Sequence, residues 1–349
     1  MKRFLKALLL PATLSLLLGS IAHAQMLVSI DTVAVGDAGN AADATGYGAV
    51  DHVYGIGKYE VTIGQYNTFL NSVASVTSAS YIVDLWRPWM QTSLYMAGIS
   101  RSGSGTVLDP YRYSVIGPSG VTPPGASSPG NRPIAEVSWF GAARFANWVN
   151  NGATNGASTE TGAYTLNGAT NGIIMKNADA TWYLPTADEW YKAAYYKAGG
   201  TNAGYWAYPT QSDAEPGNVI GGGANQANAA VSGLYSVTQD GTLSGSQNYL
   251  TEVGTFSGSA SAFGTFDQGG NVQEWNDGVL SGSMRGLAGS GFYNANTFMA
   301  SSNSMSHLEP NSSGGGFRLA TVPEPTSCAL LLMAGAGALF VCRRRKNSL

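Results

Sequence analysis

Hydrophobic and polar residues alternate over short stretches of this chain, and three segments show the spacing of an amphipathic helix. These segments cover residues 62–70, 138–149 and 186–195. Each begins with a hydroxyl side chain that can cap a helix N-terminus, namely Thr62, Ser138 and Thr186. In the third segment Glu189 follows Thr186 at the spacing of a capping box. The pattern therefore predicts three short helices.

The strand signals are weaker and the loops are long. Residues 54–61 alternate like a strand, residues 26–30 can form an edge strand, and residues 249–256 can form short strands. Residues 75–130 and 199–262 are rich in Gly, Ser, Pro and Asn, which is typical of loops. We therefore predict a loop-rich domain with few helices and short strands.

A hexapeptide repeat and the aromatic content refine this prediction. The sequence NGATNG at residues 151–156 recurs at residues 167–172, which indicates a duplicated loop and not a solenoid. The chain has 8 Trp, 18 Tyr and 11 Phe, and these can supply the apolar contact area that long aliphatic helices would otherwise provide. Because no linker interrupts residues 50–320, we predict one domain there, preceded by a lead-in at residues 25–49.

The N-terminus has the three parts of a secretory signal peptide. Lys2, Arg3 and Lys6 form a basic region, and residues 8–18 form a short apolar region. The small-x-small sequence at residues 22–24 is a cleavage site, so residues 1–24 are predicted to be removed. The alternative is an uncleaved anchor helix.

The C-terminus carries a second targeting signal. Residues 326–342 are uncharged, and 17 residues is the short end of what spans a bilayer. A plain membrane anchor is one interpretation. The flanking residues favour another: they are Val322, Pro323, Glu324 and Pro325 before the run, and Arg343, Arg344, Arg345 and Lys346 after it. Together these parts of residues 321–349 resemble the PEP-CTERM sorting signal. The resemblance implies a Gram-negative source, export, transient anchoring in the inner membrane, and processing by an exosortase-type enzyme.

Charge and cysteine content exclude several classes of function. The net charge is −3, but the two ends hold seven of the 18 basic residues and one of the 21 acidic residues, so the rest carries −9. This acidic domain is not expected to bind nucleic acid. Both cysteines, Cys328 and Cys342, lie in the tail, and the domain has only His52 and His307. Disulfides, a zinc site and a three-histidine iron site are thereby excluded from the domain.

Five segments in order resemble the formylglycine-generating enzyme (sulfatase-modifying factor) family. They are residues 57–70, 132–148, 184–190 and 266–275, and the pair formed by residues 285–286 with 316–320. The resemblance spans about residues 50–320. It implies an α+β fold of the C-type-lectin-like class, with little regular secondary structure.

The family's chemistry implies a specific pair of residues. It oxidises a sulfatase cysteine to formylglycine with Cu(I) held by two thiolates, the soft ligands that a cuprous ion needs. Aligning Phe292 with the family's Trp places Asn294 and Met299 at the two thiol positions. We therefore expect no copper, and expect a non-catalytic binding or structural module on the surface or in the matrix, with an extracellular polysaccharide or protein ligand. The alternative is a formylglycine-generating oxidase or a divergent oxidoreductase acting on protein or small-molecule thiols.

The family also implies structural calcium. Side-chain oxygens of Asn271 and Glu274, with a backbone carbonyl at Val272, are ligands that Ca²⁺ prefers. The competing interpretation is that these side chains satisfy a buried turn before Trp275. Asn228 and Asn248 are weaker candidates for a second calcium site.

Three further groups of residues carry possible polar or stacking roles. The family resemblance suggests that Glu60 and Arg318 form an ion pair that closes the fold. Asp188 and Glu189 are adjacent on a helix and do not converge as a catalytic pair. A set of aromatic residues can form a sugar-stacking platform, although a core role is favoured; it comprises Trp86, Trp89, Tyr205, Trp206 and Tyr208.

Overall fold

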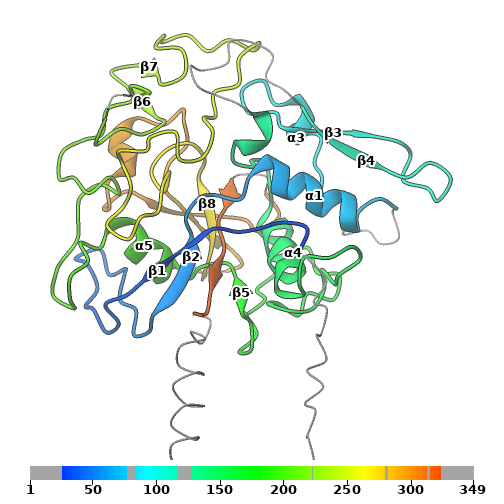
Figure 1. Cartoon of the computed structure of the whole chain (residues 1–349), viewed down its shortest axis with the longest axis horizontal. Helices are drawn as coiled ribbons and strands as arrows, with labels where there is room; N and C mark the ends of the chain where they lie inside the picture. Colours follow the sequence, from blue (N-terminus) through cyan, green and yellow to red (C-terminus); the bar gives the residue numbers. More distant parts are fainter. Residues whose placement is uncertain are drawn as a thin grey trace, which may run out of the picture.

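Short helices and short strands are joined by long loops in the computed structural model (Figure 1). The structure describes residues 26–76, 84–116, 128–221, 223–279, 282–312 and 315–323. The α-helices are α1 (Ile63–Val73), α3 (Trp89–Thr92), α4 (Trp139–Asn150) and α5 (Ala187–Tyr195), and two 3-10 turns cover Pro129–Asn131 and Asn296–Met299. The predicted loop-rich α+β architecture is confirmed. Within the described ranges, no helix is long and apolar enough to cross a membrane.

One antiparallel sheet joins strands from near both ends of the described chain. Its order is β1-β2-β12-β5, with β1 (Thr32–Val35), β2 (Tyr54–Gly57), β12 (Ala320–Thr321) and β5 (Trp182–Tyr183). Ile56 faces Val33 on one side and Ala320 on the other. The lead-in segment therefore contributes strand β1. The edge strand expected at residues 26–30 is wrong, because that stretch makes a bend in which Leu27 donates its backbone N–H to Ala153.

The second sheet carries or adjoins the residues of the candidate site. Its order is β10-β9-β8-β11, with β10 (Met305–Leu308), β9 (Arg285–Ala288), β8 (Glu274–Val279) and β11 (Gly316–Phe317). Strands β8 and β9 are antiparallel, with an irregularity between Trp275 and Val279. Strand β11 runs parallel to β8 and sets Gly316 opposite Glu274. The last residues of the domain are thereby brought beside the start of β8.

Two small ribbons complete the strands. They are β3 (Ile99–Ser102) with β4 (Arg112–Val115), and β6 (Ala230–Val231) with β7 (Leu234–Tyr235). The short strands expected at residues 249–256 are wrong. The backbone there donates to scattered partners instead of a ladder: the Tyr249 N–H bonds to the Tyr95 carbonyl and the Val253 N–H to the Asn131 carbonyl.

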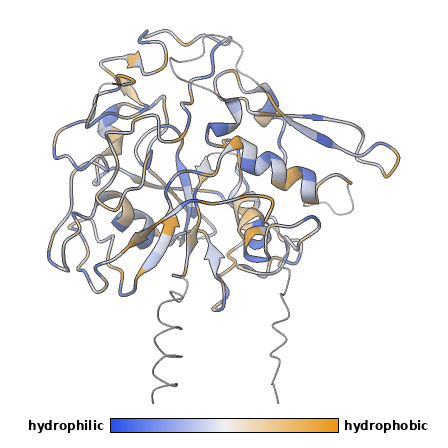
Figure 2. Cartoon of the chain, viewed as in Figure 1, coloured by the Kyte–Doolittle hydropathy of each residue, from blue (hydrophilic) through white to orange (hydrophobic). Residues whose placement is uncertain are grey.

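Aromatic rings fill the space between α1, α4 and β11, as the composition predicts. Phe145 lies 5.3 Å from Phe69 and 5.3 Å from Phe317, measured between ring centroids. Tyr66 and Trp148 join the same cluster at 5.9 Å and 5.6 Å from Phe145. Hydrophobic and hydrophilic residues are interleaved along α1, as expected of a helix with one buried face (Figure 2).

All three predicted N-caps form. The side chains of Thr62, Ser138 and Thr186 each accept a hydrogen bond from the backbone N–H three residues later. The Glu189 carboxylate accepts a hydrogen bond from the Thr186 N–H, which completes the predicted capping box. Helix α1 has an equivalent box through Gln65. These bonds are local, so sequence spacing alone predicts them.

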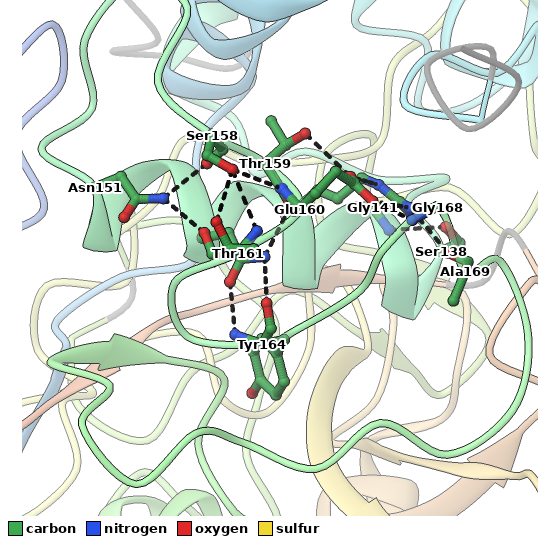
Figure 3. Close-up of polar contacts among 12 residues, drawn as sticks. Ser138, Gly141, Asn151, Ser158, Thr159, Glu160, Thr161, Tyr164, Gly168 and Ala169 are labelled. Carbon is green, nitrogen blue, oxygen red and sulfur yellow. Dashed lines mark hydrogen bonds and ion pairs between the residues drawn. The ribbon is translucent and has the colours of Figure 1, made fainter.

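Helix α4 is buried all round and not on one face as its pattern suggests. Eleven of its 12 residues are buried, because the loop at residues 151–172 folds over its outer side. The loop supplies partners for the two buried polar side chains of the helix. Arg144 pairs with Glu160 at 2.7 Å, and Asn147 donates to the Thr159 and Tyr164 carbonyls. Figure 3 shows this network, in which Glu160 and the backbone of Tyr164 face the helix from the loop.

Candidate functional site

A buried ion pair lies at the junction of β8 and β11. Arg318 donates to both oxygens of Glu274, each at 2.6 Å, and neither side chain is exposed. The indole of Trp190 on α5 donates to the same carboxylate at 2.8 Å. Arg318 also donates to the carbonyls of Gly57 and Phe266. This pair thus connects α5 and β2 to strand β8 and to the residues that directly follow β11.

The expected Glu60–Arg318 pair is therefore wrong, because Glu274 holds the guanidinium. Glu60 accepts a long 3.5 Å hydrogen bond from Asn271, and within the described chain its Oε1 is buried without a partner. Burial and the negative charges of Asp267 and Glu274 raise the pKa of Glu60 well above its usual value. Burial also raises the pKa of Asp267, to about 6. A neutral Glu60 is the form that this surrounding favours.

The turn before β8 brings two of the predicted residues together. Asn271 sits at φ 59°, and its Oδ1 accepts hydrogen bonds from the Asn228 amide at 3.0 Å and from the Thr251 N–H at 3.1 Å. Val272 is buried in a hydrophobic cluster beside this turn. Asn248 lies elsewhere: its amide donates to the Ala97 carbonyl.

This arrangement does not fit a calcium ion at Asn271 and Glu274. Ca²⁺ needs several free oxygens, whereas the oxygens of both side chains already accept N–H donors. A guanidinium at 2.6 Å from Glu274 would also repel a cation. Among the residues with described positions, no group of three or more His, Cys, Asp or Glu side chains could hold a metal ion. The contacts favour the interpretation that these residues satisfy a buried turn.

The segment at residues 292–299 shows what occupies the two expected thiol positions. Asn294 lies in a turn, where its Oδ1 accepts from the Gly291 N–H at 2.8 Å. Met299 is fully buried in a separate apolar cluster with Tyr208, Ala227 and Ala229. Asn294 offers an amide bound to its own turn, and Met299 offers a thioether enclosed in the core.

A second polar cluster joins residues that the sequence pattern did not connect. Glu189 Oε1 accepts from the Tyr183 hydroxyl and lies 2.9 Å from His52 Nε2. Burial lowers the pKa of His52, but its bonds to Asp51 and Glu189 outweigh this effect and the net shift is upward. Asp188 turns away and accepts from the Gly48 N–H. No local signal reveals the His52–Glu189 contact, since the two residues are 137 positions apart.

The aromatic residues considered as a sugar platform do not share one face. Trp86 and Tyr208 are buried in two different hydrophobic clusters. Tyr205 packs edge to face on Tyr196, while Trp89 is 59% exposed on α3. The favoured core interpretation therefore holds for Trp86 and Tyr208.

A surface cavity of about 220 Å³ lies between α3 and the loop that precedes Tyr249. Of its lining residues, the sequence pattern singled out only Asn248, and for a different purpose. Two smaller cavities of about 100 Å³ and 10 Å³ adjoin Glu60 and Asp267.

The model of the sulfatase-modifying factor enzyme 1-like domain matches residues 26–322. The chain belongs to this family. The sulfatase-modifying factor domain thus begins well before residue 50 and includes β1. A second model, of the PEP-CTERM protein-sorting motif, matches residues 321–346 directly after the family domain. A search of curated proteins finds no match.

Solved structures are similar to this sulfatase-modifying factor domain at low identity. CarF is 22% identical, with 85% of this chain and 99% of that chain covered and a TM-score of 0.47. The Treponema denticola variable protein 1 is 17% identical (85% and 96% covered, TM-score 0.49), and PvdO from Pseudomonas aeruginosa is 15% identical (84% and 92% covered, TM-score 0.40). The C-type-lectin-like α+β fold of the family is the fold of this chain.

The sorting motif implies export and processing by an exosortase. Of its expected residues, Val322 and Pro323 are described and follow β12 directly. Glu324, Pro325, Arg343, Arg344 and Arg345 lie outside the described residues, as do the signal peptide at residues 1–24 and the membrane segment at 326–342.

Proposed function

We propose that this protein is an exported, surface- or matrix-associated member of the sulfatase-modifying factor family that binds a ligand and does not oxidise thiols. The observation that carries the proposal is the identity of the residues at the two thiol positions. A cuprous ion needs thiolates. Asn294 and Met299 supply an amide committed to a turn and a thioether enclosed in an apolar cluster.

The position of the cysteines supports the same proposal. Cys328 and Cys342 follow the family domain, which ends at residue 322, so the domain itself contains no thiol. The sorting motif supports export, and a signal peptide at residues 1–24 would start it.

An oxidation assay tests the proposal. The full chain is supplied with copper, oxygen and a cysteine-containing sulfatase peptide, and formylglycine is measured by mass spectrometry against a cysteine-bearing family member. We expect no product above the protein-free background. A C328S/C342S double variant is the matched control, because it removes the two tail thiols and leaves the domain unchanged. Formylglycine formation by this variant at a rate comparable to the cysteine-bearing enzyme contradicts the proposal.

Metal removal gives an independent test of the site. Because hydrogen bonds already satisfy Asn271 and Glu274, we expect EDTA to leave the thermal unfolding midpoint unchanged. Elemental analysis of the purified protein should show neither copper nor iron at stoichiometric levels. A large fall of the midpoint in EDTA that calcium restores would instead establish structural calcium in the domain.

A further inference from the structure

The cavity beside α3 is built from two parts of the chain that lie far apart in sequence. One wall comes from the end of α3 and the residues after it, and the other from the loop at residues 245–248. Its lining residues are Gln91, Thr92, Ser93, Leu94, Tyr95, Ala97, Ile116, Gly245, Gln247 and Asn248. None of these side chains is charged, although the domain as a whole is acidic.

One wall is polar and held in position. Asn248 donates to the Ala97 carbonyl at 2.8 Å and accepts from the Leu250 N–H at 3.0 Å, so both ends of its amide are fixed. Gln247 is only 4% exposed and donates to the Asn248 carbonyl at 2.6 Å. The bond to the Asn248 carbonyl fixes the orientation of the Gln247 side-chain amide.

Polar atoms of both walls remain available to a ligand. Within the part of the chain that the structure describes, Gln247 Oε1, Ser93 Oγ and Gln91 Nε2 have no hydrogen-bond partner. They comprise an acceptor, a hydroxyl that donates and accepts, and a donor.

The α3 wall also carries apolar surface, and part of it is fixed. Leu94 is 62% exposed, and Tyr95 is held edge to face by Tyr249 at 5.9 Å between ring centroids. The Tyr249 N–H donates to the Tyr95 carbonyl at 2.7 Å, which ties the wall to the loop that carries Gln247 and Asn248. The cavity therefore offers uncharged hydrogen-bonding groups on both walls and apolar surface on the α3 wall.

We propose that this cavity binds a neutral saccharide unit, which deepens the proposed binding function and rests on it. A charged ligand would lose its hydration and meet no opposite charge. A wholly apolar ligand would cover free amide and hydroxyl groups without bonding them, which costs free energy for each group. A neutral sugar presents hydroxyls that both donate and accept, together with apolar C–H surface for Leu94 and Tyr95.

Gly245 allows the cavity to be filled without disturbing the core. It is exposed, its φ is not positive, and a Cβ added there would meet only Leu94 Cδ2, at an ordinary 3.6 Å. A bulky side chain in G245F would therefore occupy the cavity. Gly36 is the matched control, because it also has no positive φ, a Cβ there would meet nothing within 4 Å, and it lies at the end of β1 outside the cavity lining.

The experiment uses the full chain purified in detergent and a panel of neutral hexoses and N-acetylhexosamines with the matching uronic acids. Binding is followed by saturation-transfer NMR and calorimetry. We expect at least one neutral sugar to bind in the millimolar range or tighter, and its uronic acid to bind about tenfold more weakly or worse. G245F should lose at least about tenfold in affinity while G36F keeps it, with both thermal midpoints near that of the unchanged protein.

Three results would overturn the proposal: no neutral sugar binds, uronic acids bind as well as neutral sugars, or folded G245F binds undiminished. If G245F does not fold, S93A takes its place, since it removes one free hydroxyl and is expected to weaken binding several-fold. The oxidation assay is run on the same preparation. Formylglycine without sugar binding defeats both proposals, whereas absence of both activities defeats only the saccharide site.

Discussion

Three buried arginines in this domain each have a carboxylate partner. Arg318 is held by Glu274, and Arg144 by Glu160. Arg285 pairs with Asp277 at 2.7 Å, and its guanidinium lies 3.8 Å from the centre of the Trp139 ring. A buried charge without a partner is costly, so these side chains fix which segments must meet in the fold.

The Glu274–Arg318 pair gives the sharpest stability prediction at this scale. E274Q keeps the shape of the side chain but leaves the Arg318 guanidinium buried beside a neutral amide. We expect a loss of about 3–5 kcal/mol in the free energy of unfolding, measured by urea denaturation. The control is D109N, which removes an exposed partner of Arg112 and should cost less than about 1 kcal/mol. Equal effects of the two changes would contradict the argument.

The buried carboxyls make stability depend on pH. Burial raises the pKa of Asp267 to about 6 and, against the attraction of Arg285, that of Asp277 to about 7; the pKa of Glu60 is also raised. The folded state therefore keeps protons that the unfolded chain releases near pH 4, so these groups stabilise the fold most at low pH. Their contribution is lost as the pH rises from about 4 to about 7.

The variant E60Q isolates the contribution of Glu60 to the pH dependence of stability. A glutamine is uncharged at every pH, so the decline of unfolding free energy between pH 4.5 and 7.5 should become shallower, and stability at pH 7.5 should be unchanged or higher. Urea denaturation across this range checks it, with D109N as an exposed control. An unaltered pH slope in E60Q would show that Glu60 titrates as in the unfolded chain.

At the scale of elements, the contacts that begin the helices are local in sequence, whereas the contacts that shape the turn before β8 join distant segments. Thr62, Ser138 and Thr186 cap their helices through backbone groups three residues away. The turn before β8 instead requires positive φ at Gly270 and Asn271, and a close approach to residue 228. It is held by segments distant in sequence, so its shape follows from packing.

Gly270 tests how far that turn depends on close approach. It has φ +98°, and a Cβ there would lie 2.5 Å from the Asn228 carbonyl oxygen. G270A is expected to cost about 1–3 kcal/mol or more. Its control is G221A, at φ +78° with nothing within 4 Å, which carries the backbone strain without the clash and should cost about 1 kcal/mol. If the two variants are equally stable, the contact with Asn228 is not tight.

At the scale of the whole molecule, the fold sets where the sorting tail begins. Strands β1 and β12 pair with opposite edges of β2, so the first and last strands of the described chain meet in one sheet. The Val322 N–H makes a final bond to the Thr181 carbonyl. The match to the sorting motif begins at residue 321, so in sequence the motif follows the family domain directly.

This arrangement predicts how the protein is processed. Because the motif follows the last strand directly, we expect cleavage near it to leave the domain intact. Mass spectrometry of protein from its own host should find a C-terminus close to residues 322–325. A variant with Pro323, Glu324 and Pro325 replaced by Ala should keep the tail and stay with the membrane fraction. Recovery of the unchanged protein only with its full tail would contradict this expectation.

The sequence alone predicted the helix starts, the signal peptide and the sorting motif, the α+β family fold and the absence of thiols from the domain. These features depend on residues a few positions apart, or on which residues are present at all. The family motifs also identified Glu60, Asn271, Glu274 and Arg318 as important positions.

Only the tertiary structure decided how these residues pair. Glu274 and not Glu60 holds Arg318, because β11 runs parallel to β8 and sets the two side by side. Helix α4 is enclosed because the loop that directly follows it folds back and satisfies Arg144 and Asn147. The uncharged cavity exists because residues 91–97 meet residues 245–248. The Glu274–Arg318 contact spans 44 positions and the Asn248–Ala97 contact across the cavity spans 151, so the periodicity of hydrophobic residues does not predict either contact.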